Sequence, residues 1–366
     1  MALVGLGKVS AAHAAALGEV PGSRFIGVLD TDPERTRVAA SRYGVRPYRS
    51  LDELLEDRAV DAITVCTPHR AHAATAIAAA SAGRHVLVEK PMATTLAECD
   101  AMIRVAERNG VRIGVVSQRR WYPPVRRVKT VLERGGIGRP ILATLQLLGW
   151  RGPEYYAMDA WRGSWSGEGG GILINQAIHH LDLLEWFMGP VVEVDAYVAN
   201  LSHPAIEVED TAIGIVRFES GALGSIVASN CQYPGLYGRI HVHGDSGCSV
   251  GVQTETGSAF VAGQNQPIEP PFNDVWTIPE DAGHIARWRR ADRRSARARD
   301  AGQYYHRLQI EDFVAAVAGQ REPAVNGRDG RSSVELFTAL YRAQRNGGRV
   351  RLPLQPDPTD GTPLDC

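Results

Sequence analysis

Residues 4–10, Val4-Gly5-Leu6-Gly7-Lys8-Val9-Ser10, lead from a short apolar run into a helical pattern. Gly5 permits a tight turn and Gly7 lets the backbone approach a ligand, while the following helix offers free N–H groups at its positive end. Ser10 stands where a dinucleotide fingerprint has its third glycine. Because a lone G-x-G is common by chance, this turn predicts a dinucleotide site only through its surroundings.

The first 118 residues alternate β-rich runs with helical patterns. The expected strands are Ala2 to Val4, Arg24 to Asp30, Val60 to Cys66, His85 to Glu89 and Val111 to Val116. Helical periodicity between them, as in Ala71 to Ala82 and Leu96 to Asn109, is typical of βαβ units with right-handed crossovers. The pattern predicts an α/β fold with a doubly wound parallel sheet over residues 1–118.

Beyond residue 118 the pattern changes to strands separated by Gly and Asn turns. Strand-like runs occur at Ile141 to Leu148, Val191 to Val198, Thr211 to Arg217, Ala222 to Ser229 and Arg239 to His243. Helical patterns occur at Ile172 to Met188, Tyr304 to Ala318 and Ser333 to Arg345. We expect an α+β domain with a mostly antiparallel sheet over residues 119–352, followed by a proline-rich tail at residues 353–366.

Acidic and hydroxyl residues follow the expected strands of the first domain. Asp30 ends the second strand about 25 residues after Gly5, where a carboxylate binds ribose hydroxyls and repels a 2′-phosphate. This favours NAD, although Arg35 and Arg37 keep NADP open, and Asp30 can instead cap the next helix. Thr67 and Pro68 follow the third strand on the expected nicotinamide side. His72 is either a neighbour of that ligand or a helix-surface residue.

Lysine is rare in this chain, which makes Lys90 informative. Only Lys8, Lys90 and Lys129 occur among 40 basic residues. A partly buried Lys can lose its proton near neutral pH, which Arg cannot do, although an ordinary salt bridge is the simpler interpretation. Pro91 forces an extended backbone at Lys90, which directs the side chain from the strand end toward the expected ligand edge.

A second polar group lies on the helix after Gly169-Gly170-Gly171. Asn175, His179, Asp182 and Trp186 fall on one helical stripe among apolar residues. Such a stripe requires partners, and structural hydrogen bonds are one interpretation. A redox site at an alcohol or ketone needs a group that exchanges the hydroxyl proton, and His has a suitable pKa.

These motifs together resemble one known family. They are Gly5-Leu6-Gly7 with Asp30, Thr67-Pro68 with His72, Glu89-Lys90-Pro91, and Gly169-Gly170-Gly171 followed by Asn175 and His179. The combination runs through nearly the whole chain and is similar to the glucose-fructose oxidoreductase, inositol dehydrogenase and rhizopine catabolism protein family (Gfo/Idh/MocA). The resemblance implies a Rossmann domain and a C-terminal α+β domain whose open sheet often mediates oligomers, hence a homo-oligomer, either a dimer or a tetramer.

The resemblance also implies NAD(P)-dependent hydride transfer between nicotinamide and a hydroxyl or keto carbon of a sugar or cyclitol. On this basis Lys90 binds the reacting hydroxyl and His179 accepts or donates its proton. The expected cofactor contacts are Gly5, Gly7, Lys8, Val9, Asp30, Thr67, Pro68, His72, Glu89 and Lys90. Two alternatives stay open: a glycosidase that oxidises its sugar transiently, as some relatives do, and a non-catalytic NAD or sugar sensor.

Asn175 departs from the inositol dehydrogenases of this family, which carry an Asp that pairs with the His. Without that carboxylate we expect Lys90 to take a larger part in proton transfer. By the same resemblance, members acting on nucleotide-linked sugars share the Asn form, which favours such a sugar as the substrate. The leading hypothesis is reaction at its C3 hydroxyl or ketone. The expected substrate contacts are Lys90, Arg119, Trp161, Arg162, Asn175 and His179, because aromatic rings stack on sugars and Arg binds hydroxyls or phosphate.

Composition limits the other classes of function. The net charge of −1 and pI of about 6.8 favour neither a nucleic-acid nor a membrane partner. The five cysteines have no C-x-x-C spacing, and no apolar run reaches the roughly 18 residues of a membrane span, so we expect a cytoplasmic protein with reduced thiols. His241 and His243 alternate on a strand without acids at metal-ligand spacing, so no metal site is predicted.

Overall fold

The computed structural model describes residues 1–256, 258–261, 264–267, 269–297 and 300–364. The chain forms two compact units. One contains Met1–Gln118 and Asp300–Val334, and the other contains Arg119–Arg299 and Glu335–Cys366. Among the described helices, none is long and apolar enough to cross a bilayer.

A six-stranded parallel sheet forms the centre of the first unit, in the order β3-β2-β1-β4-β5-β6. Its strands are β1 (Ala2–Val4), β2 (Gly27–Leu29), β3 (Arg46–Pro47), β4 (Ala62–Val65), β5 (His85–Val88) and β6 (Ile113–Val115). All residues of β1, β2 and β4 are buried, as expected of parallel strands covered on both faces. The order, with β1 between β2 and β4, confirms the predicted doubly wound sheet.

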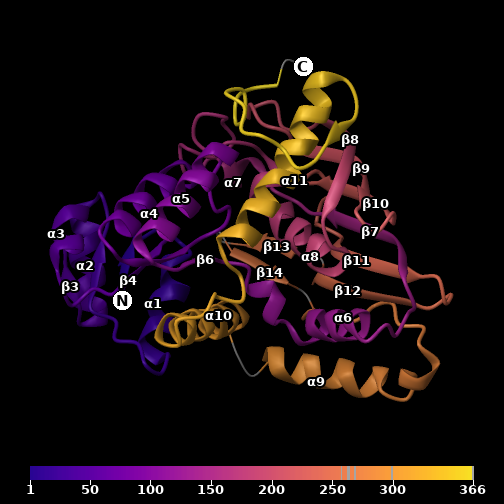
Figure 1. Cartoon of the computed structure of the whole chain (residues 1–366), viewed down its shortest axis with the longest axis horizontal. Helices are drawn as coiled ribbons and strands as arrows, with labels where there is room; N and C mark the ends of the chain where they lie inside the picture. Colours follow the sequence, from indigo (N-terminus) through magenta and orange to yellow (C-terminus); the bar gives the residue numbers. More distant parts are fainter. Residues whose placement is uncertain (257, 262–263, 268, 298–299, 365–366) are drawn as a thin grey trace. The chain divides into compact units, whose positions relative to one another are not determined.

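Helices cover both faces of this sheet (Figure 1). They are α1 (Ser10–Glu19), α2 (Pro33–Tyr43), α3 (Leu51–Glu56), η1 (His69–Ala71), α4 (His72–Ser81), α5 (Leu96–Asn109) and α10 (Ala301–Ala318). The pair α4 and α5 lies on one face, and the pair α1 and α10 lies on the other. Local sequence sets the ends: Thr95 and Glu98 form a capping box on α5, and Gly110 ends it in the left-handed conformation.

Helix α10 corrects the predicted domain boundary. The division after residue 118 is found, but residues 300–334 belong to the first unit and not to a continuous domain over residues 119–352. Ile310 and Phe313 of α10 pack in one buried cluster with Leu3 and Leu17. An apolar helical stripe predicts that a helix is covered but does not say by which core. The predicted separate tail, residues 353–366, is grouped with the second unit, and Cys366 lies outside the described residues.

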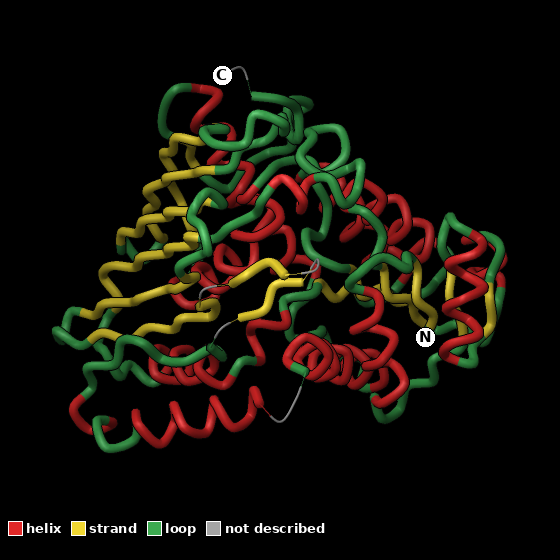
Figure 2. Tube along the Cα trace, turned by 180° about the vertical axis from the view of Figure 1, so that it is seen from behind, coloured by secondary structure: helices red, strands yellow, loops and turns green. Residues whose placement is uncertain are grey.

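The second unit contains a seven-stranded, mostly antiparallel sheet in the order β12-β11-β7-β10-β9-β8-β15. Its strands are β7 (Pro140–Leu148), β8 (Val191–Ala199), β9 (Thr211–Phe218), β10 (Leu223–Ser229), β11 (Tyr237–Gly244), β12 (Ser249–Thr256) and β15 (Val350–Arg351). Figure 2 shows these strands side by side in one curved layer. Only β10 and β7 pair in parallel, and a separate hairpin joins β13 (Ser258–Val261) to β14 (Gln264–Pro267).

Helices cover one face of this sheet. The helices are η2 (Gln118–Trp121), α6 (Pro123–Glu133), α7 (Pro153–Tyr156), η3 (Leu173–Ala177), α8 (Ile178–Met188), η4 (Pro279–Asp281), α9 (Ile285–Arg297) and α11 (Gly327–Asn346). Helix α8 packs on β7 and β11, and residues of β9 alternate between buried and exposed. One face of the sheet therefore meets helices, whereas the other keeps exposed apolar side chains.

Replacing Phe313 with Ala should lower the free energy of unfolding by about 3–5 kcal/mol, because a fully buried ring leaves a cavity in the core of the first unit. Denaturant unfolding followed by circular dichroism measures this loss. The exposed Arg58→Ala variant of the same unit is the control and should change little. A loss below 1 kcal/mol for Phe313→Ala would contradict the placement of α10 in this core.

Candidate functional site

Parallel pairing brings four strand ends to one edge of the first sheet. Val4 pairs with Leu29 and with Val65, and Val65 pairs with Val88. The residues that follow these strands therefore leave the sheet at one level, and the segments beginning at Gly5, Asp30, Cys66 and Glu89 share that edge. Open α/β sheets bind ligands at this carboxyl edge, next to the strand where the order reverses.

The glycine turn fits a nucleotide pyrophosphate. Gly5 has a φ of +90°, and a Cβ there would lie 2.6 Å from the Cys66 carbonyl and the Thr67 nitrogen, so only glycine is tolerated. A Cβ on Gly7 would meet nothing within 4 Å, which leaves open space beside the turn. The Ser10 hydroxyl donates to the Gly7 carbonyl at 2.5 Å and so holds the turn where a third glycine was expected.

Asp30 is tied directly to this turn. Its carboxylate accepts the Leu6 N–H at 2.7 Å and the Asp32 N–H at 2.9 Å, and the residue stays partly exposed. Asp32, and not Asp30, caps α2, so the alternative capping role for Asp30 is wrong. Arg37 is engaged by Glu34 through two hydrogen bonds, which leaves it less suited to a 2′-phosphate. These contacts favour NAD over NADP.

His72 has a role that the sequence did not indicate. Its side chain is buried, and its two ring nitrogens lie 2.7 Å from the Pro91 carbonyl and 2.8 Å from the Thr67 carbonyl. Burial lowers the pKa of His72, although the two carbonyls oppose the shift. Backbone carbonyls thus engage both ring nitrogens, and His72 joins the segments that follow β4 and β5.

Other predicted cofactor contacts have different surroundings. Lys8 and Pro68 are exposed, Val9 is partly buried at the start of α1, and Thr67 has a buried hydroxyl without a partner among the described residues. Such an orphaned hydroxyl on the ligand edge suits a cofactor amide or hydroxyl. Glu89 is buried, and its carboxylate accepts hydrogen bonds from His13 and from the Lys90 N–H within the unit.

The polar helix of the second unit begins with a π turn, Leu173–Ala177, that the periodicity did not predict. Wider turns of this kind often occur at functional sites. Glu209 closes its first turn: the buried carboxylate accepts the N–H groups of Gly171 and Leu173 and the Tyr341 hydroxyl. Burial raises the pKa of Glu209 to about 7, against the effect of these donors. Sequence reasoning missed Glu209, whose only signal is its place in an acidic pair, Glu209 and Asp210, before β9.

A carboxylate reaches Asn175 from outside the helix. The Asn175 amide donates to the Glu168 carboxylate and, at 2.8 Å, to the Tyr155 hydroxyl. Glu168 is buried and also accepts the Gly163 N–H at 2.7 Å. His179 lies one turn further along the helix and is buried as well. Glu168, immediately before the three glycines, therefore places a buried carboxylate beside Asn175, and the sequence analysis did not single it out.

The predicted pocket residues fall into two groups. The Arg162 guanidinium makes cation–π contacts with the rings of Tyr155 and Trp161, each at 4.5 Å from the ring centroid. It also donates to Asp159. Arg119 is buried and donates to Glu255 and to Thr254, so its guanidinium takes part in a structural network. Arg162 therefore remains the better candidate for a ligand contact.

His241 corrects a minor expectation. Asp274 lies 2.7 Å from its Nε2 atom, although no acid was expected nearby. This length suits a direct hydrogen bond between the two side chains.

This site belongs to an NAD-binding oxidoreductase. Residues 1–117 match the model of an oxidoreductase family with an NAD-binding Rossmann fold, and residues 125–250 match the GFO/IDH/MocA C-terminal domain. The chain belongs to the GFO/IDH/MocA family. It is 31% identical over 255 residues to the myo-inositol 2-dehydrogenase of Thermotoga maritima, covering 67% of this chain and 72% of that protein.

Two further relatives span almost the whole chain. The 1,5-anhydro-D-fructose reductase of Ensifer adhaerens is 28% identical over 331 residues, covering 89% of this chain and 90% of that protein. The WlbA dehydrogenase from Bordetella pertussis, solved in complex with NADH and UDP-GlcNAcA, is 34% identical with a TM-score of 0.80, covering 97% and 98% of the two chains. The family resemblance predicted from the motifs is confirmed.

Replacing Glu209 with Gln should remove a pH-dependent loss of stability. The pKa of Glu209 is about 7 in the folded protein against an ordinary 4.5, so the wild type loses stability as pH rises from about 4.5 through 7. The full loss is about 3 kcal/mol. Urea unfolding at pH 5 and pH 8 should show Glu209→Gln gaining on the wild type at the higher pH. Equal differences at both pH values, matching the exposed control Glu280→Gln, would contradict the shift.

Proposed function

We propose that this protein is an NAD-dependent dehydrogenase or ketoreductase that acts on a ring hydroxyl or ketone of a sugar or cyclitol. One observation carries the proposal: Lys90 leaves β5 at the edge that also holds the glycine turn and Asp30. A lysine at that edge stands beside the place where a dinucleotide binds. When bound, NAD⁺ supplies the acceptor for the hydride that leaves the substrate carbon.

Lys90 has the central role in this proposal. In oxidation, the neutral Lys90 amine accepts the proton of the substrate hydroxyl while the C–H bond breaks, so the carbon becomes a ketone and Lys90 an ammonium. In reduction, the ammonium returns that proton to the carbonyl oxygen. Each direction conserves the proton and the electron pair. The turn that carries Lys90 is held by buried partners, which keep the backbone of Lys90 in a fixed position.

The second unit supplies further proposed roles. We assign His179 as a second group that exchanges the substrate proton, because its imidazole can carry a proton near neutral pH. Glu168 and Asn175 form the hydrogen-bonded pair that orients polar groups on that helix. The Asn175 side chain is neutral, so the proposal leaves Lys90 as the principal proton acceptor.

The substrate class rests on relatives and on the pocket chemistry. The WlbA dehydrogenase from Bordetella pertussis was solved with UDP-GlcNAcA, and the relative from Thermotoga maritima is a myo-inositol 2-dehydrogenase. Arg162, held over Trp161 and Tyr155, suits an anionic or hydroxyl-rich ring. We propose a nucleotide-linked sugar, oxidised or reduced at C3, as the first substrate to test, with inositols as the second.

Lys90→Met should lower turnover at least ~100-fold, the usual effect of removing an acid/base group, and leave folding and NADH binding intact. Absorbance of NADH measures turnover of UDP-GlcNAcA and myo-inositol. Lys129→Met is the matched control, since Lys129 lies on α6 and donates to the Trp186 carbonyl. Activity of Lys90→Met near the wild-type level would contradict the assignment. Release of sugar without net NADH would indicate the glycosidase, and NADH binding without turnover of either compound would indicate a sensor.

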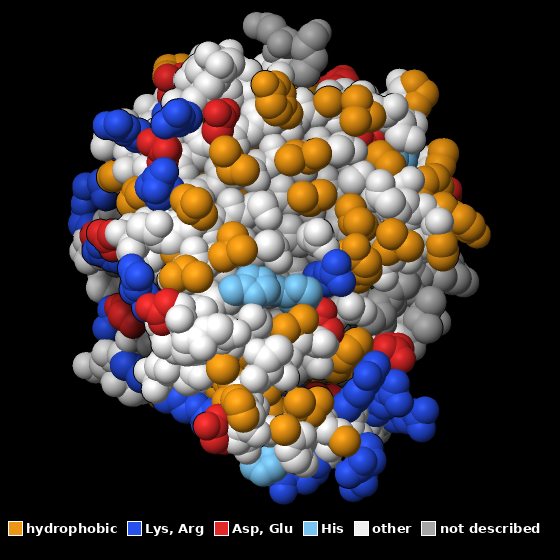
Figure 3. Space-filling view, turned by 90° about the vertical axis from the view of Figure 1, so that its right-hand side faces the viewer, with side chains coloured by type: hydrophobic (Ala, Val, Ile, Leu, Met, Phe, Trp, Pro, Cys, Tyr) orange, Lys and Arg blue, Asp and Glu red, His pale blue; other side chains and the backbone are white. Residues whose placement is uncertain are grey.

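We also propose that the protein is a cytoplasmic homo-oligomer that assembles through the uncovered face of its seven-stranded sheet. The exposed apolar side chains on this face are Leu142, Tyr197, Ile213, Ile215 and Leu223. Tyr197 is 81% exposed and pairs with Ile213 across β8 and β9, so these side chains are neighbours. Figure 3 looks onto this part of the surface and shows hydrophobic side chains with few charges among them. Apolar patches of this kind mark protein interfaces.

Ile215→Asp should convert the oligomer into a species of 39.7 kDa, because a charge in an apolar interface has no partner. Light scattering coupled to size exclusion measures the mass. The control is Val38→Asp, which alters an exposed apolar residue of α2 in the first unit. A wild-type mass of 39.7 kDa would contradict the proposal.

A further inference from the structure

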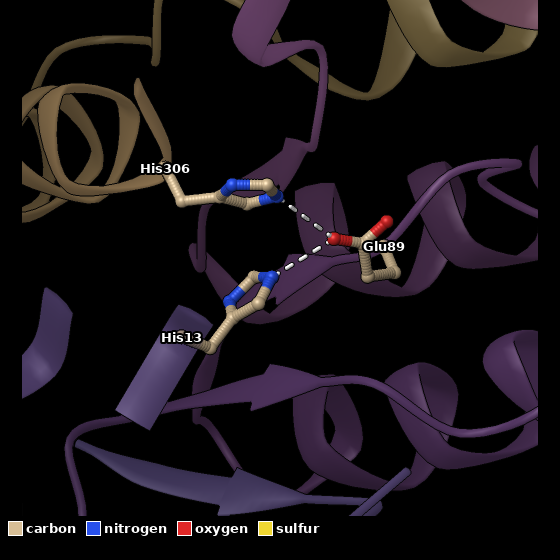
Figure 4. A group of neighbouring side chains, drawn as sticks. All are labelled: His13, Glu89 and His306. Atoms are coloured by element: carbon tan, nitrogen blue, oxygen red, sulfur yellow. Dashed lines mark hydrogen bonds and ion pairs between the residues drawn. The ribbon is translucent and has the colours of Figure 1, made fainter. Parts of the chain in front are cut away.

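Three buried ionisable side chains meet beneath the Lys90 turn. His13 comes from α1, Glu89 follows β5, and His306 comes from α10, and both imidazoles point at the Glu89 carboxylate (Figure 4). Their exposed fractions are 0%, 5% and 6%. Three buried ionisable groups are costly unless they neutralise and hydrogen-bond one another, so their arrangement requires an explanation.

The distances indicate shared protons and not a metal ion. His13 Nε2 lies 2.8 Å from Glu89 Oε1, and His306 Nε2 lies 3.5 Å from the same oxygen. Two ligands of a tetrahedral zinc ion would be about 3.3 Å apart, given bonds of roughly 2.0–2.1 Å. The 2.8 Å contact is a direct N–H···O hydrogen bond.

Hydrogen-bond partners fix where the protons reside. His306 Nδ1 lies 2.5 Å from the Gly302 carbonyl, which can only accept, so this nitrogen carries a proton. Its Nε2 faces the carboxylate and must carry a proton too for that contact to be attractive. His13 donates from Nε2 to Glu89, and the Thr64 hydroxyl can donate to its Nδ1 at 3.1 Å. The cluster is therefore neutral as a whole: Glu89 is an anion, His306 a cation and His13 uncharged.

The electrostatics agree with this assignment. Burial opposes ionisation of Glu89, but the hydrogen bonds and charges of His13 and His306 outweigh it and hold the pKa of Glu89 well below its ordinary value. Burial lowers the pKa of His13, consistent with a neutral ring. Burial and the Glu89 charge together raise the pKa of the Cys66 thiol well above its ordinary value, so that group stays protonated beside the anion.

The remaining carboxylate oxygen acts on the catalytic turn. Glu89 Oε2 accepts the backbone N–H of Lys90 at 3.0 Å. On the other side of Lys90, His72 from α4 holds the Pro91 carbonyl at 2.7 Å. Buried groups therefore fix the backbone on both sides of Lys90, and Glu89 places an anion one residue before it.

We propose that Glu89 is a positioning residue which, anchored by His13 and His306, fixes the Lys90 backbone and supplies the negative charge that tunes the Lys90 amine. This inference rests on the proposed function of Lys90. The two charges of the Glu89 and His306 ion pair then act on the Lys90 amine with opposite sign: the carboxylate favours its ammonium form, and the imidazolium disfavours it. If the cluster were purely structural, Glu89→Gln would lower turnover in the Lys90→Met background as well.

The three lysines of the chain make the test direct. Reductive methylation with ¹³C-formaldehyde gives one NMR signal for each of Lys8, Lys90 and Lys129. The signal that disappears in Lys90→Met belongs to Lys90. The pH titration of that signal measures the Lys90 amine without any substrate. We expect Glu89→Gln to move its midpoint down, and His306→Gln to move it up, each by about half a unit or more. The Lys8 and Lys129 signals serve as internal controls.

Turnover with NAD⁺ and UDP-GlcNAcA or myo-inositol gives the second measurement. Glu89→Gln should lower kcat about 10- to 100-fold with little change in NADH binding, because a misplaced proton acceptor affects the reacting geometry. Adding Glu89→Gln to Lys90→Met should lower turnover no further, since Glu89 acts through Lys90. If Glu89→Gln does not fold, the direction in which His306→Gln shifts the Lys90 midpoint still tests the inference.

Each outcome supports or overturns the inference. Opposite shifts of the Lys90 midpoint together with non-additive turnover support it. Unchanged or parallel shifts in the two variants overturn it, as does a further loss of turnover in the double variant. If Lys90→Met itself stays active, the proposed function fails first. If Lys90→Met is inactive while Glu89→Gln has wild-type turnover and an unchanged Lys90 signal, this inference fails alone.

Discussion

The in-register parallel pairing of β1, β4 and β5 is the constraint on which the candidate site of the first unit depends. It places the glycine turn, the Thr67 segment and the Lys90 turn at one level of one sheet edge. The close approach of Gly5 to the Cys66 carbonyl holds two of these segments together. The imidazole of His72 joins the Thr67 segment to the Lys90 turn, because its ring nitrogens lie near the Thr67 and Pro91 carbonyls. A ligand edge is thus built mainly from backbone contacts, and side chains fix its details.

Buried carboxylates stabilise both halves of the chain in the same manner. Glu89 organises the Lys90 turn in the first unit, whereas Glu209 and Glu168 organise the glycine-rich start of the polar helix in the second. Each accepts backbone N–H groups that would otherwise lack partners in a buried turn. They differ in charge balance: imidazoles compensate Glu89, whereas burial dominates at Glu209 and raises its pKa to about 7.

The sequence predicted features that local pattern determines. Strand ends could be placed from apolar runs, so Gly5, Asp30 and Lys90 could be assigned to one edge before the structure was known. The sequence could not predict that α10 completes the core of the first unit, because an apolar helical stripe shows that a helix is covered but not which element covers it. Nor could it pair Glu89 with His306 or Asn175 with Glu168, because these contacts depend on tertiary placement and on an unpredicted π turn.

The central claim is that a hydride passes directly between the substrate carbon and nicotinamide while Lys90 takes the proton. The most direct test uses NAD⁺ with UDP-GlcNAcA deuterated at C3, or with inositol deuterated at every ring carbon, and mass spectrometry of the reduced cofactor. We predict one deuterium in the cofactor with the wild type, and reduced cofactor formed at least ~100-fold more slowly with Lys90→Met. Reduced cofactor without deuterium, or deuterium found in the solvent, would contradict direct transfer.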